Sequence, residues 1–209
     1  MLRWALLSGA ILATAPAAAT SAVAAVKLTS GLQQMYSLSE MSPPNALEMT
    51  VCYGFVCRLR IDLPFMADER KLITEMMSKG KASPADERKA IQQVFVWWDH
   101  RVAQEIGTNK RVANADVRAF DADHNFDCWD TTRNASSLLL VLQEWGLLRY
   151  HRVTDPRYRG NLFVGQLPHN TAVLQETAAA GTKWVVDQWP TAFGQVPDVM
   201  TLDKWLKEL

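Results

Sequence analysis

The stretch HNFDCWDTTRNASSLLLVLQEWG, residues 124–146, decides the fold because it predicts one long buried helix. Asp127 stands at the position of an N-cap. The later turns, SSLLLVLQEW, are apolar nearly all round, and the pattern stops at Gly146. A helix with this pattern belongs in the core, so we expect the rest of the chain to pack around it.

Cys128 lies in the first turn of that predicted helix. The unpaired backbone N–H groups and the positive dipole end of a helix start favour a thiolate over a thiol. Two considerations oppose this: cysteine is often a small buried apolar residue, and the carboxylates of Asp127 and Asp130 disfavour a second anion nearby. The position therefore offers a nucleophile, with plain packing as the alternative.

A nucleophilic thiol needs a base, and the base needs an orienting partner. HNTAVLQE and TKWVVDQW predict two strands joined by the turn TAAAGT, with His169 at the start of the first and Asp187 near the end of the second. Antiparallel pairing brings these ends together. A symmetric turn would place Asp187 opposite about Ala172, so an asymmetric loop or a bulge is required. His151 is a competing base, but no hairpin places an Asp, Asn or Glu beside it, and we favour His169.

The first 24 residues have the features of a cleavable secretory signal: Arg3, an Ala/Leu-rich run and a small-residue ending, Ala22-Val23-Ala24. An uncleaved membrane anchor is the alternative. We expect an exported protein, periplasmic or secreted, with no integral membrane domain after signal cleavage. Residues 25–46 are polar and interrupted by Pro43-Pro44, which predicts a flexible leader before a single domain over 47–209.

Export allows disulfides to persist, and the chain has three cysteines. Cys52 and Cys57 flank Tyr53-Gly54-Phe55-Val56, and a four-residue hairpin would place them opposite one another. We expect these two to be paired and Cys128 to be free. A redox-active role is disfavoured because the spacing is not Cys-x-x-Cys.

The charge balance and the acidic residues exclude some classes of partner. Lys plus Arg equals Asp plus Glu at 22 each, so nothing indicates nucleic acid or an anionic membrane as a partner. Asp121, Asp123, Asn125 and Asp127 alternate like the first ligands of a calcium loop. Phe126 stands where that loop needs Gly, and Thr132 where it needs Glu, so we expect a solvated loop and no metal.

Two further helices are expected before this loop. MADERKLITEMMSKG places Leu72, Ile73, Met76 and Met77 on one helical face and ends at Lys79-Gly80. SPADERKAIQQVFVWWDHRVAQEIG starts with Ser83 as N-cap. It repeats apolar residues at helical spacing, namely Ile91, Phe95, Trp98, Val102 and Ile106.

Three segments, DCWDTTRNASSLLLVLQEWGLLRYHRV, HNTAVL and WVVDQW, together resemble the bacterial transglutaminase-like branch of the papain-like cysteine enzymes. The resemblance implies an α+β fold with a papain-like core, in which the helix that bears the nucleophile packs on an antiparallel sheet. It implies Cys128 as nucleophile, His169 as base and Asp187 as orienter. Trp189 would shield the hydrogen bond between orienter and base. Thr171 departs from the pattern, because many members carry an aromatic residue there.

The function implied is thiol-dependent acyl transfer on amide bonds through a thioester, without a metal or an organic cofactor. Water as acceptor gives a peptidase or amidase, and an amine gives a transglutaminase. The expected partner is a protein or peptide substrate of the cell envelope. The alternative is a catalytically inactive envelope domain that binds a peptide or partner with the same fold.

Overall fold

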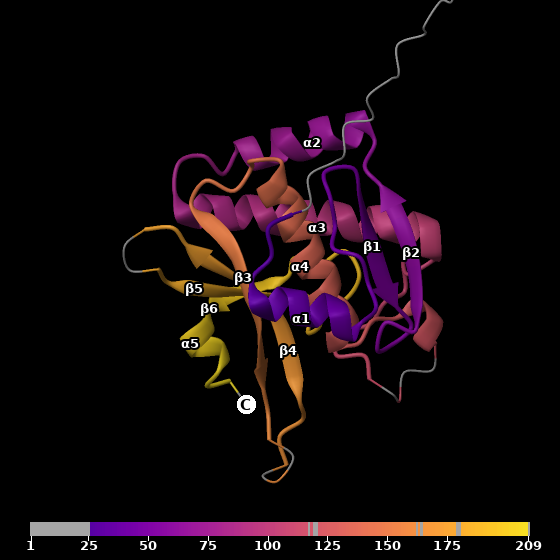
Figure 1. Cartoon of the computed structure of the whole chain (residues 1–209). Helices are drawn as coiled ribbons and strands as arrows, with labels where there is room; N and C mark the ends of the chain where they lie inside the picture. The colour runs from indigo at the N-terminus through magenta and orange to yellow at the C-terminus, as the bar shows by residue number, and fades with distance from the viewer. Residues whose placement is uncertain are drawn as a thin grey trace, which may run out of the picture.

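The computed structural model describes residues 26–208 except 117, 119, 120, 162, 164, 179 and 180, so the expected signal over residues 1–24 lies outside the described residues. The described chain is α+β, with five α-helices, the short 3-10 helix η1 and two antiparallel sheets (Figure 1). The elements in chain order are α1 Ser30–Leu38, β1 Glu48–Tyr53, β2 Leu59–Pro64, α2 Ala67–Ser78, α3 Pro84–Ile106, η1 Ala122–His124, α4 Cys128–Glu144, β3 His151–Arg159, β4 His169–Glu176, β5 Lys183–Asp187, β6 Asp198–Thr201 and α5 Leu202–Trp205.

Helix α4 is the central element of the fold. It lies between the β1–β2 hairpin on one side and the sheet β3-β4-β5-β6 on the other (Figure 1). Every residue from Asp130 to Leu142 is buried, which confirms the predicted buried helix. Each fully buried leucine of this helix stabilises the fold by about 1.5–3 kcal/mol. Helix α4 therefore supplies the core that both sheets pack against.

The hairpin is attached to α4 through one side-chain amide. The Cys52 N–H donates to Oδ1 of Asn134 over 2.7 Å, and Nδ2 of Asn134 donates to the Cys52 carbonyl over 2.8 Å. Asn134 thus takes the place of a neighbouring strand for β1. These two hydrogen bonds fix the position of the hairpin along the axis of α4.

The two helices expected before the acidic loop are present. Ser83 caps α3 by accepting a hydrogen bond from the Asp86 N–H, and Ile91, Phe95 and Trp98 are buried as predicted. In α2, Ile73 is buried, whereas Leu72 is 41% exposed and does not belong to the core.

The expectation of a flexible leader over residues 25–46 is wrong for much of that segment. Residues 30–38 form α1, and three side chains of this helix are buried, namely Leu32, Met35 and Tyr36. Asp155 of β3 accepts hydrogen bonds from the Thr29 hydroxyl and from the Gly31 N–H. The apolar residues at positions i, i+3 and i+4 form one helical face, which the polar composition of the segment masks.

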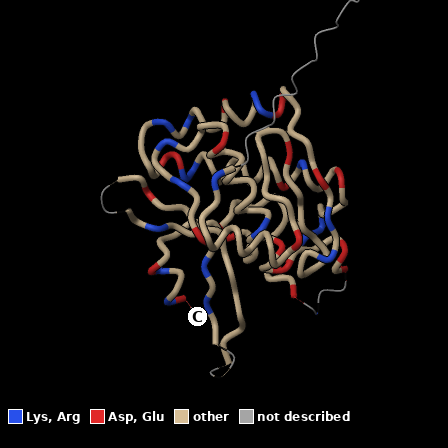
Figure 2. The backbone as a smooth tube through the Cα atoms, viewed as in Figure 1, with Lys and Arg blue, Asp and Glu red and all other residues tan. Residues whose placement is uncertain are grey.

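Charged residues of both signs occur throughout the described chain. Lys and Arg are interspersed with Asp and Glu along the described chain (Figure 2). None of the helices among the described residues combines the length and the apolar character needed to cross a membrane.

A buried carboxylate of α3 holds the start of β3. Glu87 accepts hydrogen bonds from the N–H groups of Arg149, Tyr150 and His151, at 2.7–3.2 Å. The same carboxylate binds Nδ1 of His151 at 2.8 Å, while Nε2 of His151 faces Arg88 at 3.1 Å. His151 is therefore occupied as a structural residue, which removes it as the competing base.

Replacing Glu87→Ala is expected to lower the free energy of unfolding by about 3 kcal/mol, because the buried N–H and imidazole of His151 and the partly buried N–H groups of Arg149 and Tyr150 lose their acceptor. Urea unfolding measures the loss. Glu144→Ala is the control, since Glu144 is an exposed carboxylate of α4, and it should change stability by about 0.5 kcal/mol or less. Equal effects of the two substitutions would contradict this account.

Candidate active site

The register of β4 and β5 places His169 and Asp187 on one face of the sheet. Ala172 pairs with Val186, so continuing the register puts Asp187 opposite Thr171 and not opposite Ala172 as expected from a symmetric turn. The connection is asymmetric by one residue. Because side chains alternate between faces, His169, Thr171 and Asp187 project to the same side.

The carboxylate of Asp187 is buried and accepts three hydrogen bonds. Nε2 of His169 lies 2.6 Å from Oδ2, Nε1 of Trp205 donates to Oδ2 over 2.9 Å, and the Trp189 N–H donates to Oδ1 over 3.3 Å. A carboxylate can only accept, so the network assigns the hydrogen of His169 to Nε2. Nδ1 is then the nitrogen with the free lone pair, and among the described residues it has no hydrogen-bond partner.

Two indoles enclose this hydrogen bond. The ring centroid of His169 lies 4.6 Å from that of Trp189 and 5.4 Å from that of Trp205. The two rings keep water from the contact between His169 and Asp187, which strengthens it. Trp205 was not identified from the sequence, where LDKWL shows only the start of a short amphipathic helix.

A buried ion pair fixes the loop that carries Trp189. Nη2 of Arg111 lies 3.0 Å from Asp99 of α3, and its Nη1 donates to the Thr191 carbonyl over 2.6 Å. The Trp189 indole N–H itself donates to the Ala115 carbonyl over 2.8 Å. The indole over His169 is therefore held from the side of α3.

The thiol of Cys128 lies at the first residue of α4 and beside the start of β4. The pKa of Cys128 is raised to about 11, chiefly by burial and also by the charges of Asp127 and Asp187. The backbone N–H groups of Cys128 itself and of Asn170, which directly follows His169, act in the opposite direction and lower it. The expectation that the helix start favours a thiolate is therefore wrong for the resting protein, because desolvation outweighs the helix terminus.

The expected disulfide between Cys52 and Cys57 is present, but the two cysteines are not opposite one another in a hairpin. Cys52 pairs with Arg60, and Cys57 lies in the turn between the strands. All four residues of this turn have positive φ: Gly54 76°, Phe55 67°, Val56 52° and Cys57 57°. We call residues 54–57 the left-handed turn. It costs about 1–2 kcal/mol for each residue other than glycine.

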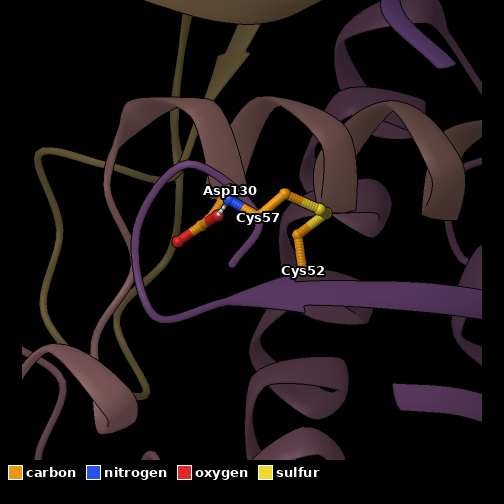
Figure 3. Close-up of side chains that lie close together, drawn as sticks. All are labelled: Cys52, Cys57 and Asp130. Carbon is orange, nitrogen blue, oxygen red and sulfur yellow. Dashed lines mark hydrogen bonds between the residues drawn. A yellow bond between two sulfur atoms is a disulfide. The ribbon is translucent and has the colours of Figure 1, made fainter. Parts of the chain in front are cut away.

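The left-handed turn binds the two carboxylates that flank Cys128. The N–H groups of Phe55 and Cys57 donate to Oδ2 and Oδ1 of Asp130 at 2.9 and 2.6 Å, and the Val56 N–H donates to Asp127 at 2.9 Å. Figure 3 shows Asp130 beside Cys57, with the disulfide to Cys52 on the far side of Cys57 from Asp130. These charge-assisted bonds offset the cost of the turn and fix the first turn of α4.

Burial and the turn have opposite effects on the charge state of Asp130. The pKa of Asp130 is raised to about 7, chiefly by burial and also by the Asp127 charge, while the N–H groups of Cys57, Phe55 and Asp127 lower it. The turn therefore favours the ionised carboxylate against the effect of burial.

The candidate metal ligands do not form a metal site in the described residues. Cys52, Cys57 and Asp130 lie within 4.8 Å of one another, but the two sulfur atoms are joined in the disulfide and offer no thiolate. The alternating residues of the loop have separate partners, since Asp121 binds His124 and Asp123 pairs with Arg58.

No family model matches the chain, and comparisons with curated proteins and with solved structures give no significant match. The functional argument therefore depends on the geometry of Cys128, His169 and Asp187.

The stability of the wild-type protein is expected to fall relative to Asp130→Asn as the pH rises. The native pKa of Asp130, about 7, lies above the unfolded value of about 3.9, so the native state binds more protons between these values. Protonation of Asp130 contributes its full stabilisation of the native state below the unfolded pKa. This contribution is lost as the pH rises through the native pKa. Urea unfolding at about pH 5 and about pH 8 should show a relative loss of about 2 kcal/mol. Parallel curves for the two proteins would contradict the raised pKa.

Removal of the disulfide by Cys52→Ser with Cys57→Ser is expected to cost more than the loop entropy alone, which is about 2 kcal/mol for so short a loop. The excess arises because the left-handed turn then loses a constraint on three unfavourable φ values, those of Phe55, Val56 and Cys57. Urea unfolding measures the loss. Asp62→Asn, on the exposed side of the same hairpin, is the control. A loss below the entropic value would show that the turn keeps its conformation without the bridge.

Proposed function

We propose that this protein is an exported thiol-dependent enzyme of the papain-like, transglutaminase-like type, which transfers acyl groups from amide bonds. Cys128 is the nucleophile, His169 the base and Asp187 the orienter. The observation that carries the proposal is the buried Nδ1 of His169, which has no hydrogen-bond partner among the described residues while Asp187 holds the opposite ring nitrogen. The free thiol of Cys128 lies at the first residue of α4.

The reaction begins with attack of the Cys128 sulfur on an amide carbonyl carbon, while the thiol proton passes to Nδ1 of His169. The carbon–oxygen π pair moves to the oxygen, and the Cys128 N–H at the open end of α4 is a donor for this oxyanion. Collapse of the intermediate breaks the carbon–nitrogen bond, and His169 returns the proton to the leaving amine. Water or a second amine then attacks the thioester. His169 takes a proton from this nucleophile and returns it to the sulfur of Cys128 as the carbon–sulfur bond breaks. No metal or organic cofactor takes part in these steps.

The raised pKa of Cys128 makes the base necessary. At neutral pH a thiol with a pKa of about 11 is almost entirely protonated, so its reactivity depends on a proton acceptor at hand. Asp187 keeps the acceptor nitrogen of His169 directed away from itself. It also stabilises the imidazolium that forms during attack.

The same pKa supports a second candidate function. A half-buried, protonated thiol is also what an inactive domain would retain, and such a domain would bind a peptide or partner of the envelope without catalysis. The two functions differ in whether His169 activates Cys128.

The proposed place of action is the periplasm or the extracellular medium, and the proposed substrate is a protein or peptide of the cell envelope. A disulfide between Cys52 and Cys57 persists in an oxidising compartment, which supports export.

Alkylation of Cys128 by iodoacetamide is expected to be about tenfold or more slower in His169→Gln than in the wild-type protein at about pH 7.5, because the variant lacks the proton acceptor. Asp187→Asn should give an intermediate rate, since it disturbs the orientation and not the base itself. Mass spectrometry of the Cys128 peptide over time measures both.

His124→Gln is the matched control. The side chain of His124 is exposed, and among the described residues its hydrogen-bond partner is Asp121, the N-cap of η1. This variant should label at the wild-type rate. If His169→Gln also labels at that rate, Cys128 is an ordinary thiol and the binding domain becomes the better account.

A further inference from the structure

A hollow of about 280 Å³ lies between α1, α4 and the sheet. Its lining includes Trp129, which directly follows Cys128 in α4, and Asn170, which directly follows His169 in β4. The hollow is therefore lined by the sequence neighbours of both the proposed nucleophile and the proposed base.

The charged lining of this hollow consists of two arginines, Arg133 and Arg157, without an Asp or a Glu. Arg133 is buried, its Nε donates to Ser39, its Nη1 donates to the Trp129 carbonyl over 3.1 Å, and its guanidinium lies 4.4 Å from the Trp129 ring centroid. Within the described chain, Nη2 of Arg133 has no acceptor. Arg157 is exposed and forms no ion pair with another described residue.

The acids nearest to this hollow have other partners. Burial lowers the pKa of Arg133 and the charges of Asp130 and Asp127 raise it, but both carboxylates accept hydrogen bonds from the N–H groups of the left-handed turn. Asp155, next to the lining residues of β3, accepts from Thr29 and Gly31. The guanidinium N–H donors of Arg133 and Arg157 in the hollow are therefore available to bind a carboxylate.

Exposed apolar side chains complete the hollow. Trp129 is 39% exposed, Tyr158 57% and Leu38 68%. Such a surface, with a buried cation on its floor, matches an extended peptide that carries an acidic side chain.

A second hollow of about 330 Å³ is lined by His169 and Trp189 and differs in charge. Its arginine, Arg159, already donates to the carbonyls of Trp205 and Glu208, and the lining includes the Glu208 side chain. Of these two hollows, only the first therefore offers unpaired positive charge, within the described residues.

We propose that the hollow bordered by Arg133 and Arg157 binds the carboxylate of an acidic residue close to the attacked amide, so that the acyl donor is an acidic peptide segment. The inference rests on the proposed function and assigns its substrate class. Nη2 of Arg133 and the guanidinium of Arg157 bind the carboxylate, and Trp129 with Tyr158 packs against its aliphatic carbons.

The test uses peptidyl chloromethyl ketones with Glu, Gln or Lys at the first or the second residue before the ketone, and follows the rate of Cys128 alkylation by mass spectrometry. In one of the two series the Glu compound should react about tenfold faster than the Gln compound, and the Lys compound most slowly. Arg157→Gln should reduce the preference for Glu, Arg157→Glu should reverse it in favour of Lys, and Arg157→Lys should retain it. Added salt should weaken it.

Arg152→Gln is the matched control, because Arg152 is an exposed arginine of the same strand that binds Gln175, and it should leave the preference unchanged. Equal rates for Glu, Gln and Lys in both series, with rates that still require His169, would overturn the acidic specificity and leave the proposed function standing. Rates independent of His169 for every compound would overturn the proposed function itself.

Discussion

The start of α4 depends on one arrangement: two carboxylates, Asp127 and Asp130, held by three consecutive N–H groups of the left-handed turn. Buried carboxylates without donors would destabilise the fold, and a turn of residues with positive φ would not form without acceptors. Each therefore requires the other. The disulfide closes the turn, Asn134 fixes the hairpin one helical turn further on, and Cys128 lies between the two carboxylates. The position of the thiol follows from this arrangement.

The second half of the site comes from the sheet. A one-residue asymmetry in the β4–β5 connection puts Asp187 on the face of His169, and two indoles then exclude water from their hydrogen bond. Because Asp187 occupies Nε2, the ring has one free nitrogen for proton transfer. The orientation of the base is thus a consequence of strand register, whereas the position of the thiol is a consequence of helix capping. The proposed reaction needs both.

Much of this arrangement could be predicted from the sequence where one local pattern was sufficient. The apolar run of α4, the Ser83 cap of α3 and the two strand-forming runs on either side of the turn TAAAGT each indicate an element by themselves. The exact register could not be predicted, since a shift of one residue changes no local preference but moves Asp187 to the other face. The left-handed turn was also missed, because Phe55 and Val56 disfavour positive φ and adopt it only with the carboxylates of α4 in place. The pKa of Cys128 was predicted in the wrong direction, because it depends on burial by segments distant in the sequence.

The central claim is that Asp187 fixes the hydrogen of His169 on Nε2 and leaves Nδ1 free for the thiol of Cys128. Long-range ¹H–¹⁵N correlation of the histidine side chains in the folded protein tests this directly, because it distinguishes the two neutral tautomers. The account predicts the Nε2–H tautomer for His169, and a change in its Nδ1 resonance when Cys128 is replaced by Ser. An Nδ1–H tautomer, or an Nδ1 resonance that does not respond to Cys128→Ser, would contradict the account.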